Sequence, residues 1–206
     1  MPRPRSLSPA RIAEAALAVI DRGGLPALTM RAVAQELGMG TMSLYRYVDD
    51  RRELEGLVVE LVLGSVDTEP PPGAPWREQV ATLVRRVRDA VAAHPAIVPL
   101  TMTHRHRSPA LLRWGEAVTD VLAGAGFDAR GRVIALRALL GYLLGAIQLE
   151  HLSPLAGPGT DAIAALPDDA YPRLAETARG ARGLAPEEEF DGGLAAVLAG
   201  IAGDAR

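Results

Sequence analysis

The chain has 206 residues, of which 49% are hydrophobic, and a formal net charge of −3. This size allows a buried core in one large or two small domains. The mild acidity argues against nonspecific coating of nucleic acid but leaves room for a local basic face. Cysteine is absent, which excludes a disulfide framework and thiolate catalysis. All 22 basic residues are arginine, the side chain suited to bidentate contacts with phosphate and guanine, although a GC-rich genome gives the same bias.

The N-terminus lacks the apolar segment of a signal peptide. Residues 1–7 carry two arginines between prolines, which predicts either a disordered tail or an arm that lies on phosphates or in a minor groove. The most apolar run, Val133–Leu149, is shorter than the roughly 20 residues that a membrane span needs, and Arg137 and Gln148 interrupt it. We therefore expect a cytoplasmic protein without membrane contact.

The first predicted helix starts at Ser8 and Pro9, a hydroxyl cap followed by a proline at the first helical position. Gly23 and Gly24 end it. One face of this helix carries apolar residues at helical spacing, which predicts a buried stripe made of Ile12, Ala16, Val19 and Ile20.

Three further helices are predicted close together. Thr29 caps the second, over residues 29–37, and Gly38 is suited to the left-handed conformation that ends a helix. The third, over 40–47, is short, with two apolar anchors four residues apart. The segment Asp50–Glu53 has the form of a capping box, and a fourth helix follows it to about Ser65.

The proline-rich segment Asp67–Pro75 predicts a domain border, because three consecutive prolines cannot continue a helix. We expect one domain over residues 1–66 and a second over 76–206. Residues 153–167 are rich in Pro and Gly, which predicts a mobile excursion between helices. No segment shows strand alternation, so the fold class is all-α, and the helices expected in the second domain are 76–93, 96–103, 109–123, 129–152, 168–180 and 186–202.

The segment Thr29–Leu54 has the plan of a helix-turn-helix, in which two short helices are joined by a glycine-containing turn. The second helix of such a unit enters the major groove and the first crosses the backbone. The helix at 40–47 is too short and too weakly apolar to form for its own core. Its outward side chains are hydrogen-bonding or aromatic, as a recognition helix requires.

The run Gly38–Val48, followed by Arg51 and Leu54, resembles the TetR family of bacterial transcriptional repressors, and Thr29 fits the same pattern. The resemblance covers about residues 8–55. It implies an all-α dimer with an N-terminal three-helix DNA-binding domain and a C-terminal domain for ligand binding and dimerisation. It further implies binding to palindromic double-stranded operator DNA and release by a small-molecule effector.

The resemblance also implies roles for individual residues. Arg31 would contact a base edge, most naturally guanine, because a guanidinium pairs with O6 and N7 together. Thr41, Met42 and Tyr45 would face the groove, although Tyr45 is equally suited to packing. Phosphate contacts would come from Thr29, Ser43, Tyr47 and Arg51.

The C-terminal half resembles, more weakly, the subgroup of the tetracycline repressors. In helix 186–202 the residues Phe190, Leu194, Val197 and Ile201 are spaced by 4, 3 and 4, as in a coiled-coil seam. The family's dimer bundle implies that these four and Leu136 and Leu140 lie between subunits. The alternative is that this seam and a second face of small residues, formed by Gly193, Ala196 and Gly200, both pack within one chain.

An effector pocket in the second domain would be lined by Leu83, Val87, Met102, Trp114, Leu144 and Gln148, each of which also fits a plain core position. The tetracycline repressors use a histidine near 99–103 to hold the drug-bound metal, and none is present there. His104 and His106 point to different sides of a helix, so we expect no metal site, no cofactor, and an apolar or aromatic effector.

Two other classes of function were weighed. An enzyme is disfavoured because no nucleophile, phosphate-binding or metalloprotease motif is present. A helical protein-interaction module without DNA binding explains the apolar seams but leaves the polar side chains of the short helix without a purpose. The sequence names neither the effector, the operator nor the regulated gene, and it does not separate a repressor from an activator.

Overall fold

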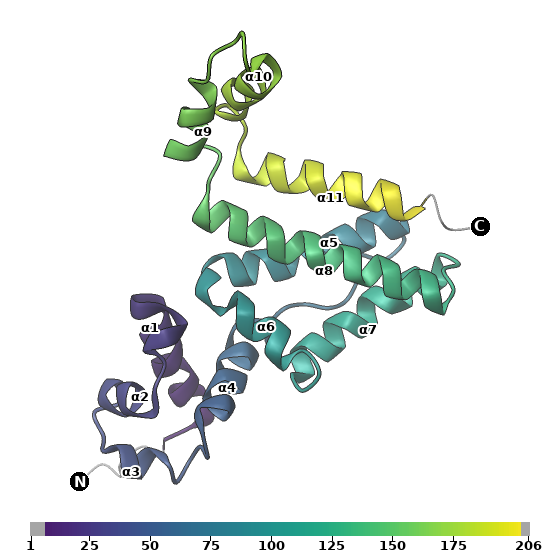
Figure 1. The fold of residues 1–206 in the computed structure, drawn as a ribbon. Coiled ribbons are helices and arrows are strands. Elements are labelled where there is room, and N and C mark those ends of the chain that lie inside the picture. The colour runs from purple at the N-terminus through teal and green to yellow at the C-terminus, as the bar shows by residue number, and fades with distance from the viewer. Residues whose placement is uncertain (1–6, 203–206) are drawn as a thin grey trace. The chain divides into compact units, whose positions relative to one another are not determined.

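The computed structural model describes residues 7–202, and all regular elements in that range are helical (Figure 1). The all-α prediction is confirmed. The arginine-containing tail predicted at residues 1–7 lies almost wholly outside the described residues. The chain packs as two compact units: residues up to Pro70 with Arg85–Val118, and Pro71–Val84 with residues from Thr119 onward.

The first unit contains the predicted helix-turn-helix. Two helices, α5 (Trp76–Ala92) and α7 (Pro109–Gly124), contribute residues to both units. The remaining elements of the first unit are α1 (Pro9–Ala27), α2 (Met30–Glu36), α3 (Thr41–Leu44), α4 (Arg51–Leu63), the 3₁₀ turn η1 (Pro95–Ile97) and α6 (Val98–His104).

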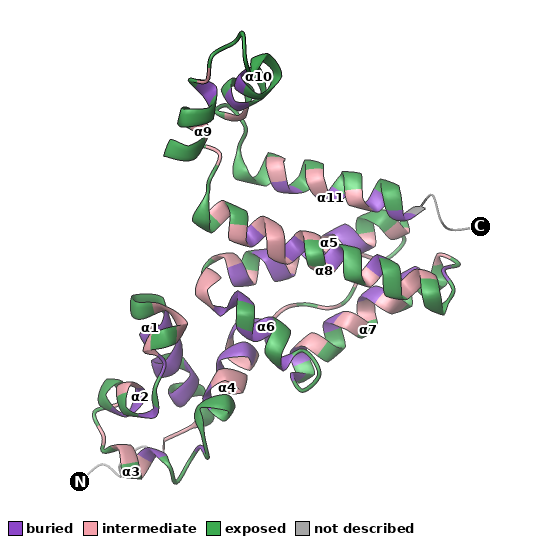
Figure 2. Ribbon diagram, in the orientation of Figure 1, coloured by how far each residue is buried: buried purple, intermediate pink, exposed green. Residues whose placement is uncertain are grey.

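Helix α1 forms as the sequence predicts and is the centre of the first unit. The Ser8 hydroxyl accepts a hydrogen bond from the backbone N–H of Arg11 at 3.3 Å, and all four residues of the predicted stripe are buried. Gly24 has φ 70° and breaks the helix where its end is predicted, after which the chain makes one more turn. The buried face, visible in Figure 2, packs on α4 and α2.

The second unit is built on α8 (Ala129–Leu152) and α11 (Pro186–Ala202), which lie side by side in Figure 1. Every fourth residue of α8 faces inward, namely Ala135, Leu139, Leu143 and Ile147. The Tyr142 hydroxyl donates to the carbonyl of Phe190 at 2.6 Å, and their ring centroids lie 5.4 Å apart. A Cβ at Gly193 would overlap the Tyr142 ring, so the close approach of these helices requires glycine there.

The predicted seam of the last helix is turned partly toward its own chain. Phe190, Leu194 and Ile201 are buried in the second unit. The fourth buried position is Leu198, whereas Val197, which the sequence pattern assigned to the seam, is half-buried. The internal seam therefore follows spacings of 4, 4 and 3, because α11 packs against the length of α8.

The segment 153–167, where no helix is expected from the sequence, contains one, α9 (Pro158–Ala164). It packs on α10 (Pro172–Ala181) to form a helical hairpin. Two arginines help to hold this hairpin together. Arg179 on α10 pairs with Asp168, and Arg182 at the C-terminal cap of α10 pairs with Asp161 on α9, each at 2.9 Å. Glycine and proline here mark the helix ends rather than a loop.

Among the described helices, α8 alone is long and apolar enough to cross a membrane by length and composition. Arg137 lies on its exposed side, and its inward residues pack in the second unit. These are the properties of a core helix in a globular domain.

Candidate nucleic-acid interface

The turn between α2 and α3 has the geometry that the sequence predicts. The Thr29 hydroxyl accepts a hydrogen bond from Ala32 N at 3.0 Å and so caps α2. At the other end, Met39 N bonds to Ala34 O and Gly38 N bonds to Gln35 O, with Gly38 at φ 67°. This is a Schellman motif, which needs a residue that tolerates positive φ. It sets the direction in which the chain enters α3.

Helix α3 is shorter than predicted, because the α-helical turn ends at Leu44 and residues 45–47 continue as a hydrogen-bonded turn. Leu44 and Val48 are buried and anchor the segment, as expected. The large side chains beside them point outward. Met42 is 80% exposed, Tyr45 is 46% exposed and Tyr47 is 44% exposed.

The eight predicted DNA contacts occupy the start of α2, α3 with the turn after it, and the start of α4. Thr29, Arg31 and Arg51 are exposed, whereas Thr41 and Ser43 are half-buried. Their roles stay predictions. Together they form a surface with one apolar, two phenolic and two guanidinium groups, which can contact base edges, thymine methyls and phosphates.

Helix α4 begins with a reciprocal cap. The Asp50 carboxylate accepts a hydrogen bond from Glu53 N at 2.9 Å, and the Glu53 carboxylate accepts one from Asp49 N at 2.6 Å. The capping box is therefore present, with Glu53 bonded one residue earlier than in the standard form. Asp50 is occupied in this cap, which fixes the first turn of the helix that carries Arg51.

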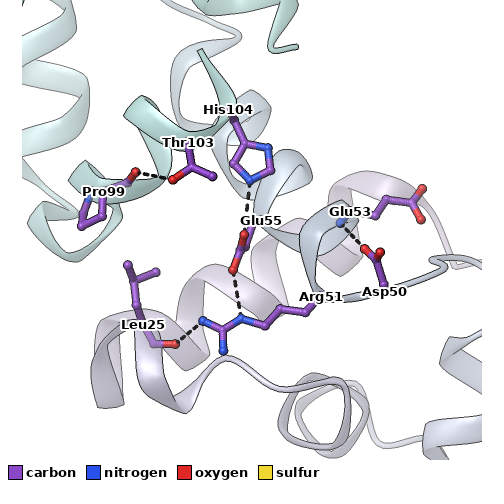
Figure 3. Close-up of polar contacts among 8 residues, drawn as sticks. All are labelled: Leu25, Asp50, Arg51, Glu53, Glu55, Pro99, Thr103 and His104. Carbon is purple, nitrogen blue, oxygen red and sulfur yellow. Dashed lines mark hydrogen bonds and ion pairs between the residues drawn. The ribbon is translucent and has the colours of Figure 1, made fainter. Parts of the chain in front are cut away.

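Arg51 has partners within the chain that the sequence does not indicate. Its Nε donates to Glu55 Oε1 at 2.9 Å and its Nη2 donates to the carbonyl of Leu25 at 3.1 Å (Figure 3). The second carboxylate oxygen of Glu55 lies 3.3 Å from Nε2 of His104 at the end of α6. An i,i+4 pair on α4 was readable from the sequence, but the contacts across 26 and 49 residues were not.

Two more polar contacts join the helix-turn-helix region to later elements of the first unit. His94 Nδ1 lies 3.0 Å from both carboxylate oxygens of Asp21 on α1. Glu60 on α4 accepts hydrogen bonds from the Ser108 hydroxyl and from Ala110 N. Each joins residues about 50 or more positions apart, which sequence periodicity cannot reveal.

An exposed ion pair joins α1 to α2. The guanidinium of Arg22 bonds both carboxylate oxygens of Glu36, with Nη1 to Oε1 at 3.2 Å. Its hydrogen bonds and charge lower the pKa of the Glu36 carboxyl, and the carboxyl in turn raises the pKa of Arg22. The pair helps to hold α2 on α1.

The six residues predicted to line an effector pocket are divided between the two units. Val87, Met102 and Trp114 belong to the first, and Leu83, Leu144 and Gln148 belong to the second. Most are buried or half-buried, whereas Met102 is partly exposed. A cavity of about 420 Å³ beside α4 in the first unit has a different lining. The pocket stays a prediction.

Comparison with known proteins identifies the family. The model of the family "Bacterial regulatory proteins, tetR family" matches residues 12–54, and the "Tetracyclin repressor-like, C-terminal domain" matches residues 69–204. The chain belongs to the TetR family. The recognition from the sequence is therefore confirmed, and members of this family are transcriptional regulators rather than enzymes.

Curated relatives agree with this assignment. The chain is 29% identical over 142 residues to an HTH-type transcriptional regulator of Saccharopolyspora erythraea, and 32% identical over 150 residues to the HTH-type transcriptional repressor DrrR1 of Streptomyces coeruleorubidus. These matches cover 69% and 72% of this chain but only 60% and 55% of those proteins. The tetracycline repressor class A of Escherichia coli is 28% identical over 199 residues, covering 95% of this chain and 91% of that protein.

Among solved structures, ActR of Streptomyces coelicolor in complex with actinorhodin matches with a TM-score of 0.79 and 30% identity. The match covers 97% of this chain and 98% of that chain. ActR without ligand gives a TM-score of 0.80 at 29% identity. The fold described above is thus that of a TetR-family regulator over nearly its whole length.

Proposed function

We propose that this protein is a ligand-responsive transcriptional repressor that binds a palindromic operator as a homodimer and leaves it when a small molecule binds. One observation carries the proposal: a four-residue helix anchored by buried Leu44, together with the turn that follows it, exposes Met42, Tyr45 and Tyr47. Large side chains held outward on so short an element have no use in a core. On a helix-turn-helix, Met42 and Tyr45 would face the major groove and Tyr47 would contact the phosphates beside it.

The contacts divide into two kinds. Arg31 is exposed at the first turn of α2 and is proposed to pair with a guanine edge, which supplies base discrimination. Thr29, Ser43, Tyr47 and Arg51 are proposed to contact phosphates, which supply affinity and orientation but no sequence information. The Thr29 hydroxyl accepts from Ala32 N and retains its own proton to donate to a phosphate.

A homodimer is proposed because a two-fold operator needs two recognition units about 34–36 Å apart. The outer faces of α8 and α11 fit this role. The exposed residues of α11 between 192 and 200 are all small and include Ala195, Ala196 and Ala199, and the exposed side of α8 carries Ile134. A groove of about 390 Å³ between the two helices, lined partly by Gly141, could receive a partner's side chain. Small residues on α11 permit the close approach of a second helix, and the exposed apolar residues of α8 would be covered in the same contact.

The proposed effector is an apolar or aromatic small molecule. ActR, whose solved structure contains actinorhodin, is 30% identical to this chain, and no histidine occupies residues 99–103, where the tetracycline repressors hold a metal. Release requires that the effector bind the DNA-free state more tightly than the DNA-bound state. We further propose a cytoplasmic location, in keeping with DNA binding.

Selection of DNA tests the proposal. Purified protein is incubated with fragmented genomic DNA of its host, and bound duplexes are recovered and measured by gel shift at several salt concentrations. We expect a palindromic duplex bound in a salt-sensitive, sequence-selective way, and its release by at least one aromatic compound from a panel that includes actinorhodin, but not by tetracycline with Mg²⁺. Failure to select any duplex would contradict the proposal.

A further inference from the structure

We propose that Glu55 is a positioning residue, which fixes the Arg51 guanidinium beside the recognition unit and is itself fixed by His104 of α6. This inference rests on the proposed function, because operator affinity is the property that the arrangement would set. It assigns a role to two residues that belong neither to the predicted DNA contacts nor to the predicted effector pocket.

The geometry is a continuous chain of hydrogen bonds through one carboxylate (Figure 3). Glu55 Oε1 accepts from Arg51 Nε at 2.9 Å, and Glu55 Oε2 lies 3.3 Å from His104 Nε2. A carboxylate only accepts, so Nε2 carries the proton that is shared. Each oxygen thus has its own partner, one in the helix that starts beside the recognition unit and one at the end of α6.

Burial increases along this chain. The Arg51 side chain is 47% exposed, Glu55 15% and His104 6%. The buried His104 imidazole and the largely buried Glu55 carboxylate have lost most of their hydration. Their hydrogen bond to each other, and the bond from Arg51 to Glu55, compensate for that loss. Displacing His104 therefore leaves Glu55 Oε2 without its donor, and the Glu55 carboxylate and Arg51 must rearrange together.

Arg51 extends the chain to the backbone of a third segment. Its Nη2 donates to the carbonyl of Leu25 at 3.1 Å, one residue after the break in α1 at Gly24 and four residues before Thr29. These two bonds use two of the five guanidinium N–H groups, so three remain for a phosphate. Glu55 can therefore orient Arg51 without consuming its capacity to bind DNA.

The packing beside His104 is close. A Cβ built at Gly56 would lie 3.6 Å from His104 Nδ1, which is ordinary contact, so alanine would fit and a larger side chain would push the ring away. The position of α6 relative to α4 is thus transmitted to the carboxylate by direct contact within the first unit.

The first test needs no DNA. The Nε–H resonance of Arg51 is assigned in ¹⁵N NMR spectra by its loss in Arg51→Lys. We expect it to shift in Glu55→Gln and in His104→Asn, and to return toward the wild-type position in His104→Gln, whose amide reaches about as far as Nε2. The matched control is His106→Asn, since His106 is exposed. An unshifted resonance in a folded His104→Asn protein would overturn the proposal.

The second test is a double-mutant cycle on affinity for a duplex selected from host genomic DNA by the wild-type protein. We expect Glu55→Ala to weaken binding about tenfold and His104→Asn severalfold, as for charge-assisted hydrogen bonds. The double variant should bind as Glu55→Ala does. Additive losses would show that the two residues act separately and would refute the proposed coupling of His104 to Arg51 through Glu55. If the wild-type protein selects no duplex, the proposed function fails, whereas the NMR result still tests this coupling.

Discussion

Helix α3 and helix α11 use side-chain size in opposite ways. Around α3 the large side chains Met42, Tyr45 and Tyr47 are outside, whereas on α11 Phe190 and Leu194 are inside and the exposed residues between 192 and 200 are all small. A short helix that exposes bulk is built to contact a grooved partner such as DNA. A long helix that exposes small residues is built for the close approach of another helix.

The largest expected effect comes from removing an anchor of α3. Leu44 is fully buried, so Leu44→Ala should lower the free energy of unfolding by about 2–5 kcal/mol and abolish DNA binding. The matched control, Met42→Ala, removes an exposed side chain of similar size and should change stability by no more than about 0.5 kcal/mol. Chemical denaturation of both variants checks this. Equal losses would mean that Met42 also packs in the core.

The next effect concerns the α8–α11 contact. Gly193→Ala places a Cβ against the Tyr142 ring and should cost about 1–3 kcal/mol of unfolding free energy, as overpacking does. Gly192→Ala on the exposed side meets no atom within 4 Å and should instead be neutral or stabilising by up to about 1 kcal/mol. Thermal melts of the pair measure the contrast. A Gly193→Ala protein as stable as wild type would show that the helices are not held this closely.

Replacing each of the two exposed arginines of the proposed DNA-binding surface should affect binding in a different way. Arg31→Ala should cost about 1–3 kcal/mol of binding free energy on the selected duplex and relax preference at one base pair. Arg51→Ala should weaken all duplexes alike and reduce the salt slope of binding by about 0.9. Titrations against matched duplexes that differ at single positions distinguish the two. A base-selective loss in Arg51→Ala would contradict its assignment to phosphate.

The smallest effect is the pH dependence of the Arg22–Glu36 pair. The pKa of Glu36 is lowered in the folded protein, so the pair stabilises the fold at pH above the ordinary glutamate pKa of about 4.3. That stabilisation is lost as the pH falls through the lower folded value. Melting temperatures of wild type and Glu36→Gln should differ slightly at pH 6, and the difference should shrink as the pH falls below about 4.3. A difference that does not shrink at acid pH would assign it to something other than this charge pair.

Local chemistry explains which parts of the fold could be predicted. The Thr29 cap, the Gly38 turn and the Asp50 cap each depend on residues within five positions of one another, and the sequence placed all three. The same is true of the break at Gly24, because a glycine pair is a local signal. Recognition of the family rested on this same dense stretch.

What the sequence missed depends on tertiary contacts. Leu198, and not Val197, is buried against α8 because of how α11 lies on that helix. Both residues are apolar and nearly equivalent by periodicity, so the sequence could not distinguish them. The helix α9 forms in a Pro- and Gly-rich segment because α10 packs on it. Arg51 bonds to the carbonyl of Leu25, which lies 26 positions earlier, and its partner Glu55 contacts His104, which lies 49 positions after Glu55. No spacing rule reaches contacts this far apart in the sequence.

Met42 on α3 and Tyr45 at its C-terminal end are proposed to contact DNA bases. The direct measurement is the affinity of wild type and a Met42→Ala, Tyr45→Ala double variant for the selected duplex and for a scrambled duplex of equal length. The double variant should stay folded, keep its affinity for the scrambled duplex and lose most of its preference for the selected one. A folded variant with undiminished preference would contradict the proposed base contacts.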